Sequence, residues 1–307
     1  MRWPRLATLL LGLLLAAGPC LAAVQVVLVS SEAGGAYVEA VRSMRAELER
    51  AGLPAQDVVE FALADLPPEG RLSPRLFVAL GTRAAATLAE RDLQTPLLST
   101  LLPRSAFERQ ARSSTRKPSL QVGLVLDQPA WRQIDLLHLA FPQAKRLGLM
   151  WGADSRVEAA ELISAASSRA LKPISPFVEA DQPVFPALKR ILEDADVLLA
   201  IADPQIYNSA SLQNILLATF RARLPTLGFS AAYVRAGSVL GLYTTPTQIG
   251  LQAAALVRSM LAGRVSPALQ FPTEFTIGVN EQVMRSLGLS LDAGQLTEAL
   301  RKLEKDQ

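Results

Sequence analysis

The stretch VQVVLVSSEAGGAYVEAVRSMRAELERAG, residues 24–52, decides the fold class. Val24 to Val29 is an almost unbroken apolar run rich in valine, which predicts a strand buried on both faces. An amphipathic pattern follows from Ala36 to Ala51, and Gly52 ends it, as expected of a helix. A buried strand followed directly by an amphipathic helix indicates the start of a βαβ unit with a parallel sheet.

The same alternation continues along the chain in two series. The first predicts strands at Leu76–Leu80 and Pro96–Leu101 around a helix at Thr82–Arg91. A polar, proline-marked connector at Arg112–Pro118 separates the two series, and we expect its charged side chains to be solvated. The second series predicts strands and helices in turn at Gln121–Leu126, Trp131–Ala140, Arg146–Trp151, Arg156–Ala170, Lys172–Val178, Val184–Asp194, Val197–Ile201, Ser209–Arg223, Thr226–Phe229 and Ala231–Ala236.

Two doubly wound halves in tandem predict an α/β protein with a cleft between two lobes, each with a parallel sheet flanked by helices. The composition, 50% hydrophobic but only 6% aromatic, suits helices packed on parallel strands. The remaining chain predicts a return helix at Gln248–Ala262, a last crossing strand at Phe271–Val279 and an amphipathic C-terminal helix from about Gln295.

The first 23 residues have the three parts of a secretory signal peptide. Arg2 and Arg5 precede an apolar run, Leu6–Ala17, which is shorter than the roughly 20 residues needed to span a bilayer. Small residues close the segment, so we expect cleavage after Ala22 or Ala23. The protein is therefore predicted to be periplasmic or secreted.

Cys20 is the only cysteine, so a chain cleaved at this place has none. Cysteine nucleophiles, disulfides and thiolate metal sites are then excluded together. A lipid anchor on Cys20 is an alternative, although Pro19 stands where a lipoprotein signal has a small residue. Loss of the two N-terminal arginines lowers the basic count from 31 to 29 against 28 acidic residues, and no basic cluster dense enough for nucleic acid remains.

Signatures of catalysis and of metal binding are weak. His138 is the sole histidine, and it lies inside a predicted helix. The segment Gly228–Ala232 resembles a nucleophile elbow without its final glycine, and a hydrolase of that type needs a histidine after the serine. We therefore expect no enzyme, no cofactor and no metal site. An exported hydrolase that uses Ser230 is the minor alternative.

Polar side chains follow the predicted strands where each strand meets the next helix. Because the carboxyl ends of parallel strands share one edge of a sheet, these turns should line the cleft. Helix N-termini there present unpaired N–H groups, and hydroxyl and carboxylate groups add donors and acceptors. The expected ligand-binding residues are Ser31, Thr82, Thr100, Trp151, Ser155, Asp203, Ser230 and Thr245.

Several of these residues also have a purely structural interpretation. Serine and threonine before helices are ordinary N-caps, which applies to Thr82, Ser155 and Ser230. The Trp151 side chain is as compatible with packing in the core as with stacking on a planar ligand. Asp203 precedes a proline, so it fits a turn as well as it fits pairing with a ligand cation.

A series of short motifs resembles the ABC-transporter substrate-binding family that includes tryptophan-binding lipoproteins. The longest, Trp131–Trp151, reads as a helix, a P-x-A-K-R turn and a strand. The order and spacing of the motifs carry the resemblance more than any single one does. The others are Asp196–Asp203, Leu224–Ser230, Val234–Ser238, Gln248–Ala254, Gly278–Asn280 and Leu287–Leu289.

The resemblance implies a type I periplasmic-binding fold, in which two Rossmann-like lobes are joined by three crossovers. We expect lobe 1 to comprise residues 24–118 and 237–268, and lobe 2 to comprise residues 119–236 and 269–307. The family's amino-acid-binding residues are mostly replaced: Trp151–Ser155 keeps only a serine. The ligand therefore stays open between an amino acid and another small polar or aromatic solute.

These observations together predict an exported, monomeric solute-binding protein that captures a small organic molecule and delivers it to an ABC permease. Closure of the two lobes around the ligand is the expected mechanism. The alternative is a sensory partner of a membrane kinase, or of another envelope system, that has no permease of its own.

Overall fold

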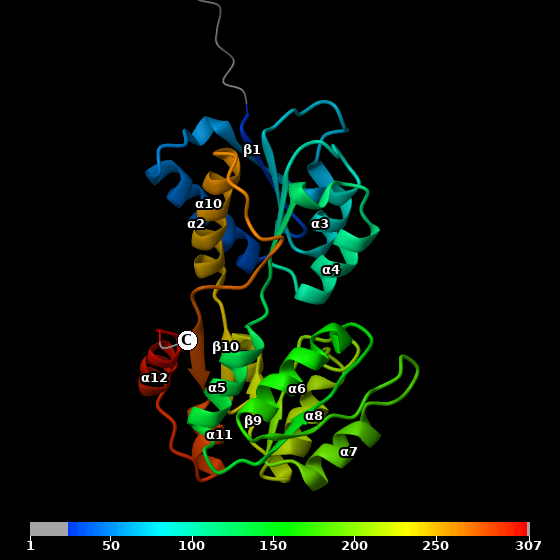
Figure 1. Cartoon of the computed structure of the whole chain (residues 1–307), viewed down its shortest axis with the longest axis vertical. Coiled ribbons are helices and arrows are strands. Elements are labelled where there is room, and N and C mark those ends of the chain that lie inside the picture. Colours follow the sequence, from blue (N-terminus) through cyan, green and yellow to red (C-terminus); the bar gives the residue numbers. More distant parts are fainter. Residues whose placement is uncertain (1–23, 306–307) are drawn as a thin grey trace, which may run out of the picture.

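The computed structural model describes residues 24–305, so the expected signal peptide and Cys20 lie outside the described residues. The described chain folds into two α/β lobes, each built on a six-stranded sheet with helices on both faces (Figure 1). This confirms the predicted fold class. Within residues 24–305, no helix is both long enough and apolar enough to cross a membrane.

The first lobe is built on a fully parallel sheet with the order β11-β5-β4-β3-β1-β2. Strands β1, β3, β4 and β5 are buried along their whole length because helices cover both faces. The strands are β1 (Val26–Ser30), β2 (Val58–Ala62), β3 (Leu76–Leu80), β4 (Leu97–Thr100), β5 (Gln121–Leu124) and β11 (Leu269–Gln270). The helices are α2 (Gly35–Arg50), α3 (Thr82–Ala89), α4 (Arg104–Ser113) and α10 (Pro246–Leu261), with single turns η1 (Ala55–Asp57), η2 (Leu63–Asp65) and η3 (Pro118–Leu120).

Helices α2 and α10 lie side by side on one face of this sheet, and α3 and α4 cover the other face (Figure 1). The α2–α10 contact is close because Gly250 has no side chain. A Cβ placed at Gly250 would overlap the carbonyl oxygen of Ala40 and the hydroxyl of Ser43. The glycine therefore sets the distance between the two helices.

Arg116 is buried, with 2% of its surface exposed, and it completes the C-terminal end of α3. Its guanidinium donates to the backbone carbonyls of Leu88, Arg91, Asp92 and Thr95. Leu88 lies in the last turn of α3 and the other three residues lie in the loop that follows, so this side chain holds the end of the helix and the loop together. The expectation of a solvated connector is wrong for this residue, and burial lowers its pKa.

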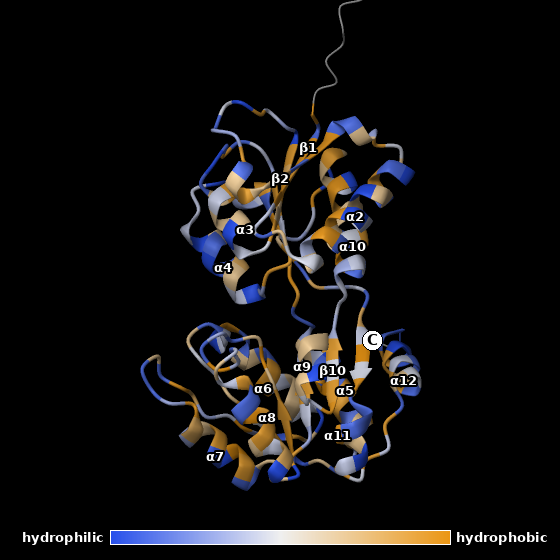
Figure 2. Ribbon diagram, turned by 180° about the vertical axis from the view of Figure 1, so that it is seen from behind, coloured by the Kyte–Doolittle hydropathy of each residue, from blue (hydrophilic) through white to orange (hydrophobic). Residues whose placement is uncertain are grey.

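The second lobe has the order β12-β10-β9-β8-β6-β7, in which β12 alone is antiparallel to its neighbour. The buried strands of this sheet form part of the apolar core of the lobe. Figure 2 shows hydrophobic strands, in orange, inside each lobe. The strands are β6 (Arg146–Leu149), β7 (Lys172–Ile174), β8 (Val197–Leu199), β9 (Thr226–Gly228), β10 (Leu240–Tyr243) and β12 (Thr276–Val279). The helices are η4 (Ser155–Glu158), α5 (Ala130–Ala140), α6 (Ala159–Ser168), α7 (Phe185–Asp194), α8 (Leu212–Arg221), α9 (Ala231–Ala236), α11 (Glu281–Ser286) and α12 (Ala293–Lys305).

The chain passes between the lobes three times, at places that differ from the expected boundaries. Strand β5 and strand β11 pair with each other in the first sheet, although both were expected in lobe 2, and β10 lies in the second sheet. The proline-marked connector misled the prediction because it is a loop within the first lobe, held by Arg116. The crossovers are residues 125–129, 244–245 and 271–275, which we call the first, second and third crossovers.

Candidate ligand-binding site

A cavity of about 190 Å³ lies beside the first crossover, at the carboxyl end of the second sheet. Its floor is apolar and consists of the ends of three neighbouring strands, at Leu199–Ile201, Leu227–Phe229 and Leu242. Pro103 and Leu126 line it from the side of the first lobe. The cavity therefore occupies the place where open parallel sheets bind ligands, outside the carboxyl ends of their strands.

Three polar residues in the cavity wall are already engaged by the protein. Gln128 Nε2 donates to Thr244 Oγ1 at 2.8 Å, and Gln133 Nε2 donates to the carbonyl of Gln128 at 2.7 Å. The hydroxyl of Ser230 accepts from the backbone N–H of Tyr233 at 3.3 Å, as the N-cap of α9. These groups shape the wall and retain some hydrogen-bonding capacity toward a ligand.

Two carboxyl groups form the polar end of the cavity. Asp127 accepts a hydrogen bond of 2.5 Å from the backbone N–H of Arg104. Glu158 is 6% exposed, and its Oε1 is buried without a hydrogen-bond partner. Burial, and then the charge of Asp127, raise the pKa of Glu158 to about 9, while burial raises the pKa of Asp127 to about 6. At neutral pH Glu158 is therefore protonated and Asp127 is mostly ionised.

Two ion pairs connect the lobes next to these carboxyl groups. Arg104 in α4 of the first lobe makes two hydrogen bonds, of 2.7 and 2.9 Å, to Glu161 in α6 of the second lobe. Arg109 Nη1 lies 2.5 Å from Asp154 Oδ1 in the same gap. The hydrogen bonds to Glu161 raise the pKa of Arg104 above its usual value. Figure 1 shows α4 and α6 facing each other across this gap, so both ion pairs bridge the two lobes.

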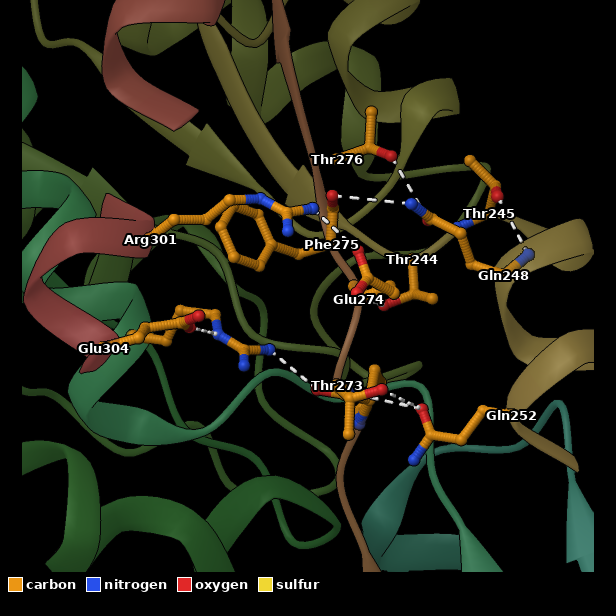
Figure 3. A network of polar contacts seen from close by, with 12 residues as sticks. Thr244, Thr245, Gln248, Gln252, Thr273, Glu274, Phe275, Thr276, Arg301 and Glu304 are labelled. Atoms are coloured by element: carbon orange, nitrogen blue, oxygen red, sulfur yellow. Dashed lines mark hydrogen bonds and ion pairs between the residues drawn. The ribbon is translucent and has the colours of Figure 1, made fainter. Parts of the chain in front are cut away.

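The second and third crossovers are tied together by polar contacts (Figure 3). The hydroxyl of Thr244 donates to the carbonyl of Glu274 at 2.9 Å. The side-chain oxygen of Gln248 accepts from the backbone N–H of Thr245 at 2.8 Å and from the hydroxyl of Thr276 at 3.2 Å. The start of α10 and the start of β12 are therefore connected.

Arg132 in α5 extends this network to the first crossover. It is 5% exposed, and its Nη1 donates to Gln128 Oε1 and to the carbonyl of Pro272, both at 2.8 Å. It also pairs with Glu304 and lies over the ring of Phe275 at 4.9 Å. All three crossovers thus share contacts with one side-chain cluster.

The eight expected ligand-binding residues are spread over several sites. Ser230 lines the interlobe cavity. Ser155 and Asp203 lie together, but they satisfy each other: the Ser155 hydroxyl donates to Asp203 Oδ2 at 2.7 Å, and the N–H groups of Ser155 and Gln205 donate to the same carboxylate. Trp151 is 4% exposed and packs in the core of the second lobe.

The other four expected residues lie at strand and helix ends. Ser31 accepts from the N–H of Ala84 in the first turn of α3, where Thr82 is exposed. Thr100 is fully buried, and its hydroxyl has no hydrogen-bond partner. Thr245 forms a capping box at the start of α10. Contact of any of the eight with a ligand stays a prediction.

The sequence prediction missed Asp127 and Glu158. Asp127 directly follows the run that forms β5, so it could have been found by the same strand-end rule as the other candidates. Glu158 falls inside the pattern assigned to one helix, and nothing local marks it as buried. Glu158 lines the cavity together with Asp127 of the first crossover, and it lines a neighbouring pocket with Arg104 of α4. A local sequence pattern does not encode this arrangement.

Three solved structures are similar to the whole described fold. One is an ABC domain in complex with L-Trp from Streptococcus pneumoniae, with a TM-score of 0.62, 14% identity, and coverage of 89% of this chain and 98% of that chain. Another is the ligand-free, open structure of a substrate binding protein with adhesive properties from Clostridium difficile, with a TM-score of 0.65, 16% identity, and coverage of 88% and 96%. The third is a conserved domain protein from Vibrio cholerae, with a TM-score of 0.60, 18% identity, and coverage of 89% and 97%.

At this level of identity the likeness shows the fold, which is that of type I periplasmic binding proteins. A comparison with curated proteins finds no match. The family model for ABC transporter substrate binding proteins matches residues 71–302, which is most of the chain and includes parts of both lobes and all three crossovers. The chain belongs to the ABC transporter substrate binding protein family.

Proposed function

We propose that this protein captures a small organic molecule in the interlobe cavity and delivers it to an ABC permease, with no catalytic step. The observation that carries the proposal is the cavity itself, which lies beside a crossover at the strand ends and is lined from both lobes. A ligand held there touches both lobes only when they are close together. Its binding free energy therefore stabilises the closed arrangement.

The proposed hinge is the set of three crossovers. The first lobe then comprises residues 24–124 and 246–270, and the second comprises residues 130–243 and 276–305. Because Gln128 and Arg132 contact all three crossovers, bending at one is transmitted to the others. The Arg104–Glu161 pair breaks on opening and forms again on closure, so it favours the closed arrangement without touching the ligand.

The proposal places the protein in the periplasm as a monomer, after removal of residues 1–23. Closure would give a permease a surface that differs between the empty and loaded forms. A ligand-sensing role for a membrane kinase uses the same cavity and the same closure. The two roles differ only in whether the captured molecule enters the cell.

The first experiment is a thermal-shift screen of the periplasmic protein against amino acids, nucleosides, purines, small carboxylates and small amines. A true ligand at about 100 times its Kd stabilises the protein by about 2.7 kcal/mol through mass action. Small-angle scattering should then show a smaller radius of gyration, and Ser230→Tyr, which fills the cavity, should abolish both effects. A screen in which no class of solute changes either quantity would contradict the proposal.

Uptake of the labelled ligand separates transport from sensing. Cells that lack the gene should lose uptake at low ligand concentration and regain it with the wild-type gene. The Ser230→Tyr gene should fail to restore uptake. Unchanged uptake with intact ligand binding would instead support the sensory role.

A further inference from the structure

The polar end of the cavity has an excess of carboxyl groups. Asp127, Glu158, Glu108 and Glu161 lie around the guanidinium of Arg104, and of these four only Glu108 has a further cationic partner within 4.0 Å, the exposed Arg112. The Arg104 side chain is committed to Glu108 at 2.7 Å and to Glu161. Within the described residues, neither Asp127 nor Glu158 has an ion pair within 4.0 Å, and Arg104, whose side chain is paired with Glu108 and Glu161, acts on these two carboxyl groups only from a longer distance.

Glu158 supplies an independent sign that a partner is missing. Its side chain is more than nine-tenths buried, it lines the cavity, and its Oε1 has no hydrogen-bond partner among the described residues. A buried polar atom without a partner costs free energy, typically about 1–3 kcal/mol. A ligand group that donates hydrogen bonds at this place would remove that cost.

The remainder of the cavity determines what such a group is attached to. Its floor is formed by leucine, isoleucine and alanine side chains together with Phe229. In the described part of the chain no three histidine, cysteine or acidic side chains are grouped to hold a metal ion. The apolar floor therefore fits the body of an organic molecule whose head meets the two carboxyl groups.

We infer that the ligand carries a positively charged nitrogen head, an ammonium or guanidinium group, which donates to Asp127 and Glu158, and an apolar body that lies on the strand ends. The inference deepens the proposed function and rests on it. A carboxylate at the same end would meet the negative charge of Asp127, so anionic solutes are selected against.

This arrangement couples ligand binding to the release of a proton. Burial and the charge of Asp127 hold the pKa of Glu158 at about 9, so the free protein keeps its proton at neutral pH. A bound cation favours the ionised carboxylate and lowers that pKa. The affinity for a permanently charged cation should therefore rise with pH, by up to about tenfold per pH unit between 7 and 9, where one proton is released per ligand bound.

The test uses probes that share one apolar body and differ in the head. These are 2-phenylethylguanidinium, 2-phenylethanol and 3-phenylpropionate, each accompanied by the compound in which a butyl group replaces the phenylethyl group. Binding of each probe is titrated by calorimetry at pH 6, 7, 8 and 9. The guanidinium stays charged throughout this range. We expect a guanidinium probe to bind at least tenfold more tightly than its matched alcohol and carboxylate, with the stated increase in affinity between pH 7 and 9.

Matched variants connect this preference to the two carboxyl groups. Glu158→Gln and Asp127→Asn should each lower guanidinium binding tenfold or more and leave alcohol binding unchanged, and Glu158→Gln should remove the pH dependence between 7 and 9. Glu298→Gln, an exposed position on α12, should behave as wild type. Thermal melting followed by circular dichroism identifies any variant that has lost its fold. If Glu158→Gln or Asp127→Asn is unfolded, the inference is tested with the variant that remains folded.

The possible outcomes separate this inference from the proposed function. If the carboxylate or alcohol probe binds as tightly as the guanidinium, or if the broad screen finds only uncharged or anionic ligands, the inference is overturned and the proposed function stands. If no solute of any class binds, both are overturned.

Discussion

Replacement of Glu158 by glutamine should stabilise the ligand-free protein, and the gain should grow with pH. The folded-state pKa of Glu158 is about 9, against about 4.5 in an unfolded chain, so the folded state holds its proton over a range in which the unfolded state has lost it. A raised carboxyl pKa means that stability falls as pH rises from the unfolded value toward the folded one. Glutamine does not titrate and has nearly the same shape.

The size of the effect follows from that interval. For each pH unit between 4.5 and 9, the free energy of unfolding of the wild type falls by at most about 1.36 kcal/mol. At pH 7 this amounts to about 3 kcal/mol, and coupling to the ionised Asp127 reduces the expected difference to about 1–3 kcal/mol. For a chain of this size the melting temperature should rise by about 2–4 °C per kcal/mol.

Urea unfolding of both proteins at pH 4.5, 7 and 9, followed by circular dichroism, measures this difference directly. The two curves should nearly coincide at pH 4.5 and separate progressively at pH 7 and 9. Glu298→Gln, at an exposed position, serves as the control and should follow the wild type at every pH. A Glu158→Gln difference that is independent of pH, or a variant less stable at pH 9, would refute the assigned burial and pKa.

Three further predictions concern the lobes and their contact. Gly250→Val should lose about 1–3 kcal/mol in thermal unfolding because the new side chain overlaps α2, whereas Gly35→Ala, with open space around it, should lose much less. Arg116→Met should lose about 1–3 kcal/mol for each carbonyl at the end of α3 and in the following loop that is left without a donor, and a loss equal to that of the exposed Lys117→Met would contradict this role of Arg116. Arg104→Gln should increase the radius of gyration of the ligand-free protein and weaken ligand binding several-fold, and unchanged scattering would show that its pair with Glu161 does not hold the lobes together.

The sequence predicted well those elements whose pattern is strong and local. The strand Leu76–Leu80 and the helix Ala231–Ala236 have the predicted bounds, because an apolar run between turn residues and a serine-capped helix are complete signals in themselves. Helix α4 was missed because its first turns are polar and its apolar positions are few. Strand β2 was missed because its outer residues are partly exposed at the sheet edge.

Membership of a lobe was harder to predict than secondary structure. Strand β5 follows a proline-marked connector, and only pairing with β4, more than twenty residues earlier, places it in the first sheet. The candidate site has the same limitation. Serine and threonine at helix starts look alike whether they cap a helix or face a ligand, and Ser155 is satisfied by Asp203, which lies in a loop 48 residues later. Glu158 lines a pocket together with Arg104 and Asp127, which lie more than thirty residues earlier, so its surroundings are not encoded nearby.

The three passages of the chain between the lobes also constrain how the protein acquires its structure. Helix α10 covers the face of a sheet whose first strand begins more than two hundred residues earlier, and it stands out in gold within the blue and cyan lobe of Figure 1. The core of the second lobe likewise includes residues of α12, the last helix of the described chain. The first lobe is incomplete until α10 has been synthesised and the second until α12 has been synthesised, so earlier segments expose apolar surface during elongation. Such a topology suits a protein that is kept unfolded until α12 is available, and truncation before α12 should prevent the second lobe from folding, measured as a loss of helix content and of part of the unfolding transition in circular dichroism.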